Sequence, residues 1–191
     1  MDNVIFLDRD GTLIKEKHYI SNPDDVELEA SVIEALGTLQ DHGFSFFIIT
    51  NQSGLARNLF ATKDYERVQE RVLSELKKHN ITIQDTYMCP HHPAGEVETL
   101  RQHCNCRKPH PGMLINACKD YKIHPDTAFM IGDKAQDVEA GHRAHMKTIL
   151  VETGYGHIVD PNALTYKPHY VAPTLLDAAN WILRSRSETR S

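Results

Sequence analysis

The stretch Val4-Ile5-Phe6-Leu7-Asp8-Arg9-Asp10-Gly11-Thr12 decides how the rest of the chain is interpreted. Its first four residues are apolar and rich in β-formers, a composition typical of a buried strand. The strand runs directly into two carboxylates, Asp8 and Asp10, and then into a Gly and a Thr. In an open α/β sheet, ligands bind beyond the carboxyl ends of the strands. Asp also caps helices and starts turns, so this stretch alone leaves a purely structural interpretation of the two carboxylates open.

The composition indicates an ordinary globular protein. The 191 residues are 40% hydrophobic and 25% charged, with a formal net charge of −5 at pH 7. This charge argues against a nucleic-acid-binding protein that depends on bulk positive charge. No apolar run is long enough for a transmembrane helix, and the N-terminus lacks the pattern of a signal peptide. We expect a cytoplasmic protein that binds neither nucleic acid nor membrane, and a monomer, because no heptad pattern or exposed apolar helix stands out.

Apolar periodicity predicts strands that alternate with helices along the whole chain. Helical spacing covers residues 30–42, 62–78, 113–121, 134–144 and 174–183, and extended segments cover 4–7, 44–49, 81–88, 128–131, 147–151 and 170–171. This order indicates one α/β domain over residues 1–191, with a mostly parallel sheet between two layers of helices. We expect residues 14–28 to form a loop over the strand ends, too short for a large cap domain, and residues 184–191 to form a disordered polar tail.

Three of the predicted strands end in groups that suit phosphoryl transfer. Asp8 and Asp10 follow the first strand, Thr50 and Asn51 follow the second, and Asp133 follows a later one. Asp8 can attack phosphorus and form an aspartyl-phosphate. Asp10 can protonate the leaving oxygen and later deprotonate a water molecule. A Mg²⁺ ion held by Asp8, Asp10 and Asp133 would offset the repulsion between carboxylates and a phosphate dianion.

Further residues complete this hypothesis. The Thr50 hydroxyl can donate to a phosphate oxygen, and Lys108 supplies positive charge beside the nucleophile and the transferring group. Asp137 lies four residues after Asp133 on a predicted helix, where it can orient Lys108 or the water molecules on the metal. The sequence therefore predicts a Mg²⁺-dependent hydrolase of phosphate monoesters.

A segment without periodicity, residues 89–108, precedes the fourth strand and contains Cys89, Cys104 and Cys106. A loop of this length inside a compact domain needs something to hold it. In a reducing compartment, clustered cysteines are more often metal ligands than disulfides. Three thiolates and one imidazole, from His91, would form a closed structural Zn²⁺ site.

The zinc hypothesis leaves alternatives open. His92 is the rival of His91 for the fourth position, and spacing alone does not decide between them. The cysteines can also remain reduced without a metal. A zinc ion would fix the end of the loop and so place the two cations Arg107 and Lys108 at the site. The fourth cysteine, Cys118, stands apart in a helical pattern and is expected to be a small buried residue.

The chain resembles the haloacid dehalogenase superfamily of phosphohydrolases in four motifs that occur in the same order. They are Asp8-Arg9-Asp10-Gly11-Thr12, Thr50-Asn51, Lys108-Pro109 and Gly132-Asp133-Lys134-x-x-Asp137. Together with the first strand they cover the chain from residue 4 to about residue 140. The resemblance implies a Rossmann-like fold, an aspartyl-phosphate intermediate and Mg²⁺. It also implies that the backbone carbonyl of Asp10 is a ligand of the metal.

The loop narrows the resemblance to one branch of the superfamily. Cys89-Pro90-His91-His92-Pro93 and Cys104-Asn105-Cys106-Arg107-Lys108-Pro109 are similar to the zinc loop of sugar-bisphosphate phosphatases and of histidinol-phosphate phosphatases. The 12-residue interval between His91 and Cys104 favours the 7-phosphate of a heptose bisphosphate as the group removed. Histidinol phosphate or another small phosphate is the alternative, and a binding module without catalysis is a remote one. The resemblance favours His91, with Cys89, Cys104 and Cys106, as the zinc ligands.

By the same resemblance, three segments are expected to bind the substrate. Their residues are Glu16, Lys17, His18, Tyr19, Thr50, Asn51, Gln52, Ser53, Arg107, Lys108 and Lys134. The Arg107 guanidinium can hold a second, non-reacting phosphate through two hydrogen bonds. For His18 and Tyr19, a solvated loop is the competing interpretation. We expect a small phosphorylated sugar as substrate, with Mg²⁺ and Zn²⁺ as cofactors.

Overall fold

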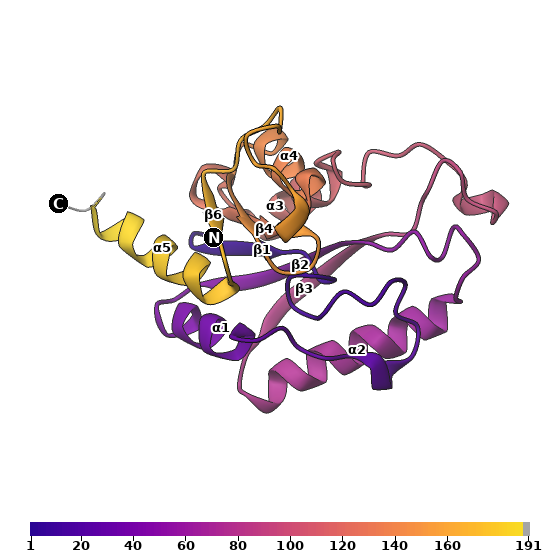
Figure 1. Ribbon diagram of the computed structural model, residues 1–191, viewed down its shortest axis with the longest axis horizontal. Helices are drawn as coiled ribbons and strands as arrows, with labels where there is room; N and C mark the ends of the chain where they lie inside the picture. Colours follow the sequence, from indigo (N-terminus) through magenta and orange to yellow (C-terminus); the bar gives the residue numbers. More distant parts are fainter. Residues whose placement is uncertain (189–191) are drawn as a thin grey trace.

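The computed structural model describes residues 1–188, which form a six-stranded sheet between two layers of helices (Figure 1). The strand order is β3-β2-β1-β4-β5-β6, and neighbouring strands are parallel throughout. The strands are β1 (Val4–Leu7), β2 (Ser45–Asn51), β3 (Ile83–Cys89), β4 (Phe129–Gly132), β5 (Lys147–Val151) and β6 (Tyr170–Ala172). This arrangement confirms the predicted three-layer α/β fold.

Helices cover both faces of the sheet (Figure 1). One face carries α1 (Val32–Asp41), α2 (Thr62–Lys78) and α5 (Leu175–Glu188), and the other carries α3 (Gly112–Tyr121) and α4 (Ala135–Arg143). Short 3-10 turns lie at Pro23–Asp25, Glu98–Leu100, Pro125–Thr127 and Gly156–Ile158. Among the described residues, no helix combines the length and the apolar character that crossing a membrane requires.

The central strand β1 is buried on both faces, which explains its unbroken apolar sequence. Ile5 and Leu7 belong to the core beneath α1, α2 and α5, whereas Val4 and Phe6 belong to the core beneath α3 and α4. All four side chains are fully buried. Alternate residues of a strand point to opposite faces, so a strand covered on both sides has no polar position.

Most elements begin and end within two residues of their predicted limits, but the last helix is longer than predicted. The sequence predicts its end at residue 183, whereas α5 continues to Glu188. The added turn is tied down because Arg184 Nε donates to the Asn180 carbonyl and the Arg186 guanidinium lies 5.1 Å from the Phe44 ring centroid. Disorder from residue 184 was therefore a wrong prediction for the first part of the tail, and residues 189–191 lie outside the described residues.

The fold brings the predicted site residues to one place. Because β1 lies between β2 and β4, the carboxyl ends of these three strands meet at the middle of one sheet edge. Asp8 follows β1, Thr50 and Asn51 close β2, and Asp133 follows β4. The chain also reverses its direction of travel across the sheet between β1 and β4, and such a switch point is where open α/β sheets bind ligands.

Candidate active site

A buried ion cluster forms around Lys108, which is 1% exposed. Its Nζ lies 2.8 Å from Asp8 Oδ1 and 2.6 Å from Asp137 Oδ1, and it donates to the Ile49 carbonyl at 2.8 Å. Burial alone would lower the pKa of Lys108, but the two carboxylates outweigh burial and raise it. The ammonium group therefore stays charged. The structure thus joins Lys108 to Asp8, 100 positions away in the sequence.

The Asp8 carboxyl is held in its charged form. Burial would raise its pKa, but the charges of Lys108 and Lys134 outweigh burial and hold the pKa below its ordinary value. Asp8 also lines the cavity described below. An ionised carboxylate that faces a cavity is the form that can act as a nucleophile.

Asp133 is fully buried on the β4 side of Asp8. Burial, together with the charges of Asp8 and Asp137, raises the pKa of Asp133 to about 8. Its Oδ2 accepts the Tyr155 N–H at 2.8 Å, whereas its Oδ1 lies 3.4 Å from Lys134 Nζ and accepts no hydrogen bond from the described residues. Carboxylate oxygens of Asp8, Asp133 and Asp137 all lie within 4.8 Å of one another. Clustered carboxylates with an unsatisfied oxygen fit a hard cation such as Mg²⁺.

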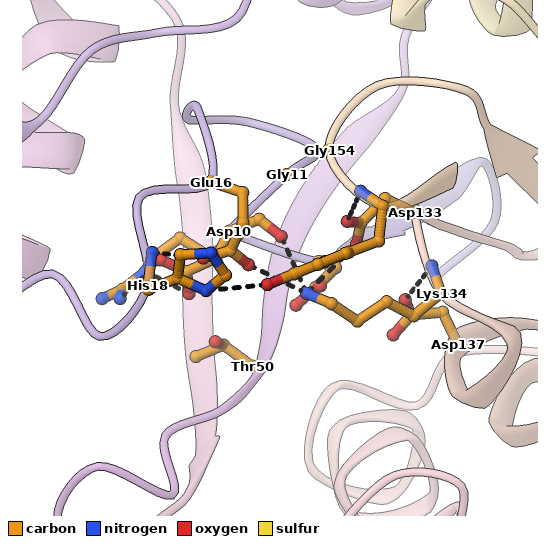
Figure 2. Close-up of polar contacts among 12 residues, drawn as sticks. Asp10, Gly11, Glu16, His18, Thr50, Asp133, Lys134, Asp137 and Gly154 are labelled. Carbon is orange, nitrogen blue, oxygen red and sulfur yellow. Dashed lines mark hydrogen bonds and ion pairs between the residues drawn. The ribbon is translucent and has the colours of Figure 1, made fainter. Parts of the chain in front are cut away.

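Two glycines make room for Asp133 (Figure 2). A Cβ on Gly11 would lie 2.2 Å from Asp133 Oδ2, and a Cβ on Gly154 would lie 2.3 Å from the same atom. Both glycines have positive φ, +89° and +51°. Thr153 Oγ1 donates to the Gly11 carbonyl at 2.7 Å. The loops after β1 and β5 therefore close around the Asp133 carboxylate.

The Asp10 side chain is held by Arg9 and Gln52 and does not join the three clustered carboxylates. Gln52 Nε2 donates to Asp10 Oδ2 and to Thr50 Oγ1, both at 2.8 Å. The Thr50 hydroxyl hydrogen is therefore left for another acceptor. The backbone carbonyl of Asp10, which is also a predicted metal ligand, accepts a hydrogen bond from Lys134 Nζ at 3.4 Å.

A cavity of about 200 Å³ adjoins this cluster. Lys134 reaches into it, with its Nζ 3.2 Å from Glu16 Oε2 and 4.9 Å from the centroid of the Tyr155 ring. Figure 2 shows Glu16, His18 and Lys134 gathered beside Asp10. The residues that line the cavity are Asp8, Asp10, Glu16, His18, Tyr19, Ile20, Asn51, Gln52, Ser53, Arg107, Lys134, Gln136 and Tyr155. Most of the predicted substrate-binding residues are among them.

Three predicted substrate-binding residues are not among the described residues that line this cavity. Lys17 turns away, because its Nζ binds the Asp25 carbonyl at 2.9 Å and lies 3.4 Å from Glu27 Oε2. Thr50 and Lys108 are each 1% exposed and lie behind the lining, where they contact Gln52 and Asp8 respectively.

Sequence reasoning missed Tyr155 and Gln136, which line the cavity, and the buried contacts of Arg9. Tyr155 follows Thr153-Gly154, directly after a strand next to β4. The Gly shortly after the carboxyl end of this strand is the signal that could have identified the loop as part of the site. Arg9 and Gln136 lie inside the first and the last of the four motifs, but nothing else in the sequence indicates their positions in the site.

The four predicted zinc ligands converge at the end of β3. Cys106 Sγ lies 3.1 Å from Cys89 Sγ, 3.2 Å from Cys104 Sγ and 3.3 Å from His91 Nδ1. Ligand atoms about 2.3 Å from one tetrahedral zinc lie roughly 3.7 Å apart, so this cluster can hold Zn²⁺. His92 lies outside it, because its ring nitrogens contact the Ala94 N–H and Arg57.

The chain is similar in sequence to proteins that are named as phosphatases. Residues 105–178 match a family model described as "HAD-hyrolase-like". The D-glycero-beta-D-manno-heptose-1,7-bisphosphate 7-phosphatase of Escherichia coli K12 is 40% identical over 187 residues, 96% of this chain and 90% of that protein. The D-glycero-alpha-D-manno-heptose-1,7-bisphosphate 7-phosphatase of Photorhabdus laumondii is 40% identical over 153 residues, 80% of this chain and 84% of that protein.

A solved structure shares both the fold and part of the sequence. The D,D-heptose 1,7-bisphosphate phosphatase of B. bronchiseptica, complexed with magnesium and phosphate, superposes with a TM-score of 0.84 at 28% identity. The superposition covers 95% of this chain and 98% of that one. With these relatives and this cluster of carboxylates around a buried lysine, the chain belongs to the haloacid dehalogenase superfamily, in the family of the D-glycero-D-manno-heptose-1,7-bisphosphate 7-phosphatases.

Proposed function

We propose that this protein removes the 7-phosphate of D-glycero-D-manno-heptose 1,7-bisphosphate, with Mg²⁺ as cofactor, in the biosynthesis of nucleotide-activated heptose. The observation that carries the proposal is the buried Lys108, whose Nζ lies 2.8 Å from the ionised Asp8 at the edge of the cavity. A fixed cation beside a carboxylate nucleophile offsets charge on a phosphoryl group during transfer. The activities named for the relatives support the heptose substrate.

In the first step, Asp8 attacks phosphorus and the bond between phosphorus and the sugar oxygen breaks. This leaves an aspartyl-phosphate on Asp8. Asp10, in its protonated form, gives its proton to the departing sugar oxygen. Lys108 and the Thr50 hydroxyl stabilise the negative charge on the phosphoryl oxygens.

In the second step, Asp10 accepts a proton from a water molecule that attacks phosphorus. The products are inorganic phosphate and free Asp8. When bound by Asp8, Asp133 and the Asp10 carbonyl, Mg²⁺ supplies positive charge that reduces the repulsion between carboxylates and phosphate. Asp137 keeps Lys108 in place through their 2.6 Å ion pair and is proposed to remain outside the metal's ligands.

The distribution of cations supports a bisphosphate substrate. Lys108 lies behind the cavity lining beside Asp8, whereas Arg107 and Lys134 belong to the lining itself. One phosphate can therefore react at Asp8 while Arg107 binds the other through two hydrogen bonds. Six other polar residues that line the cavity are proposed to bind the sugar hydroxyls: Glu16, His18, Tyr19, Asn51, Gln52 and Ser53.

The experiment that tests this function is phosphate release with Mg²⁺ from heptose 1,7-bisphosphate, fructose 1,6-bisphosphate and histidinol phosphate, with Asp8→Asn as the blank. The expected result is the highest kcat/KM for the heptose and none for the variant. A preference for histidinol phosphate would contradict the substrate. No release from any of the three would contradict the phosphatase and favour a binding module.

We also propose a monomer in the cytoplasm. The chain by itself supplies the nucleophile, the lysine beside it and the lining of the cavity. The thiols of Cys89, Cys104 and Cys106 are free, whereas an oxidising compartment would favour disulfides. A mass of 21.7 kDa in solution is expected, and twice that mass by light scattering would contradict the monomer.

A further inference from the structure

Arg9 is a buried cation that the mechanism above does not use. Its side chain is 1% exposed. It follows the end of β1 by two residues and reaches helix α2, where its guanidinium carbon lies 5.5 Å from the centroid of the Tyr65 ring. Its Nη1 lies 3.5 Å from Gln69 Oε1, also on α2. Burying a guanidinium is costly unless it is paired and hydrogen-bonded, so its partners indicate what it does.

The partner of Arg9 is the Asp10 carboxylate. Arg9 Nε donates to Asp10 Oδ2 at 3.1 Å and its Nη2 donates to Oδ1 at 3.0 Å. These two parallel bonds form the fork geometry that fixes a carboxylate in one plane. The guanidinium itself is held between an aromatic ring and an amide of α2, so the orientation of the carboxylate is tied to the core of the protein.

One oxygen of the Asp10 carboxylate keeps an open hydrogen-bond position. An ionised carboxylate offers about four lone-pair sites. Arg9 takes one on each oxygen, and Gln52 Nε2 takes the second site on Oδ2 at 2.8 Å. One site is left, on Oδ1. The Asp10 side chain is 17% exposed and lines the cavity, so this site is accessible to a bound molecule.

We propose that Arg9 is a positioning residue for proton transfer, which holds Asp10 so that Oδ1 exchanges the proton with the leaving oxygen and with water. This inference rests on the proposed phosphatase function. Arg9 acts through Asp10, because the described residues that line the cavity do not include Arg9. A proton transfer needs donor and acceptor within about 3 Å, and a freely rotating carboxylate meets that condition in only some of its rotamers.

The test compares two leaving groups. The sugar oxygen of heptose 1,7-bisphosphate needs a proton as it departs, whereas the 4-nitrophenolate of 4-nitrophenyl phosphate departs without one. The ratio kcat/KM reports the steps up to this departure. In Arg9→Met, kcat/KM for the heptose substrate should fall about 100-fold, the scale of a lost general acid. For 4-nitrophenyl phosphate it should stay within about threefold, and Asp10→Asn should show the same contrast.

Two further variants keep the test decisive. Arg9→Lys retains the positive charge but cannot form two parallel hydrogen bonds to the carboxylate, so it should show the same selective loss. It replaces Arg9→Met in the test if that variant does not fold. Gln69→Leu removes the amide that holds the Arg9 guanidinium without touching Asp10, so it should show the same selective loss at a smaller size. Equal losses on both substrates in the Arg9 variants, with native circular dichroism, would show a merely structural role and overturn the inference. A wild-type protein that hydrolyses neither substrate would instead contradict the proposed function itself.

Discussion

Two buried aspartates of the same site carry opposite pKa shifts. At Asp8, the charges of Lys108 and Lys134 outweigh burial and lower the pKa. At Asp133, burial outweighs Lys134, and neighbouring carboxylates raise the pKa to about 8. One carboxyl is therefore ionised at neutral pH, and the other holds a proton that a bound metal ion would displace. When the surroundings of two neighbouring carboxyl groups shift their pKa values in opposite directions, the two groups usually have different roles in catalysis.

Gly11 sets the space around Asp133, and Gly11→Ala should damage both folding and activity. The new Cβ would lie 2.2 Å from Asp133 Oδ2 at a φ of +89°, so the carboxylate or the loop must shift. We expect the free energy of unfolding to fall by about 2–4 kcal/mol and Mg²⁺-dependent activity to be lost. Chemical unfolding and phosphate release measure the two effects.

Two other glycines provide matched controls for Gly11. Gly43 has a φ of +79°, but a Cβ added to it would meet no atom within 4 Å, so Gly43→Ala isolates the backbone strain and should cost roughly 1–2 kcal/mol with full activity. Gly37 in helix α1 has the same open space without positive φ, so Gly37→Ala should stabilise by up to about 1 kcal/mol. Wild-type activity in Gly11→Ala would show that the Asp133 contact is not needed.

Arg107 is predicted to decide affinity for the non-reacting phosphate. It lines the cavity and follows directly after Cys106, a member of the cluster that can hold zinc. In Arg107→Ala, KM for heptose 1,7-bisphosphate should rise roughly 10- to 100-fold, the effect of losing hydrogen bonds to a charged group. KM for a small monophosphate should change little. Equal increases of KM for both substrates in steady-state kinetics would remove this role.

At the scale of elements, the loop between β3 and α3 is expected to depend on a metal held by Cys89, His91, Cys104 and Cys106. We expect Cys106→Ser to lose zinc from the purified protein, to lower the melting temperature and to reduce activity, because Arg107 and Lys108 follow the ligand directly. Cys118→Ser is the control, since this free cysteine lies on helix α3 outside the cluster. Zinc content by elemental analysis and thermal unfolding test both variants. A Cys106→Ser protein with a full complement of zinc would contradict the assignment.

Besides the bond from Thr153 to the Gly11 carbonyl, the loop after β5 meets the loop after β1 through a hydrogen bond between Tyr155 Oη and His18 Nδ1 at 2.8 Å. Tyr155→Phe removes this bond while keeping the ring beneath Lys134. A lost neutral hydrogen bond costs about 1 kcal/mol. We therefore expect KM for the heptose substrate to rise roughly fivefold with kcat nearly unchanged. Unchanged KM in steady-state kinetics would show that the two loops are ordered without this contact.

Local signals predicted the elements, and long-range contacts account for what was missed. The apolar run ahead of Asp8 and the residue types of the zinc loop are visible in the sequence itself. The direction of Lys17 depends on Asp25 and Glu27, which a periodicity argument does not place next to it. The extension of α5 depends on contacts such as that with Phe44, far earlier in the chain. Tyr155 enters the site only because β5 pairs with β4.

For the whole molecule, metal binding should depend on pH through Asp133. Its pKa is raised to about 8 in the folded protein, so without metal the folded state keeps a proton that the unfolded chain releases above pH ~4. Stability of the metal-free protein should therefore fall as pH rises from about 4 to 8. Mg²⁺ displaces this proton, so its apparent affinity should be roughly 50-fold higher at pH 8 than at pH 6.

Thermal unfolding with and without Mg²⁺ at these two pH values measures this linkage. The rise in melting temperature at a fixed, subsaturating Mg²⁺ concentration should be larger at pH 8. Asp133→Asn, which cannot ionise, should abolish the difference between the two pH values along with most of the Mg²⁺ effect. An equal rise at both pH values in the wild-type protein would show that no proton competes with the metal.

The place of β1 at the centre of the sheet has a consequence for synthesis of the protein. The ribosome makes β1 and Asp8 first, but their neighbours β2 and β4 come later, and Lys108 follows Asp8 by 100 positions. At translation rates of about 10 residues per second, a growing chain carries its nucleophile for roughly ten seconds without the cation beside it. A nascent or prematurely terminated chain that lacks β4 is therefore expected to be inert toward the phosphate esters of the cell.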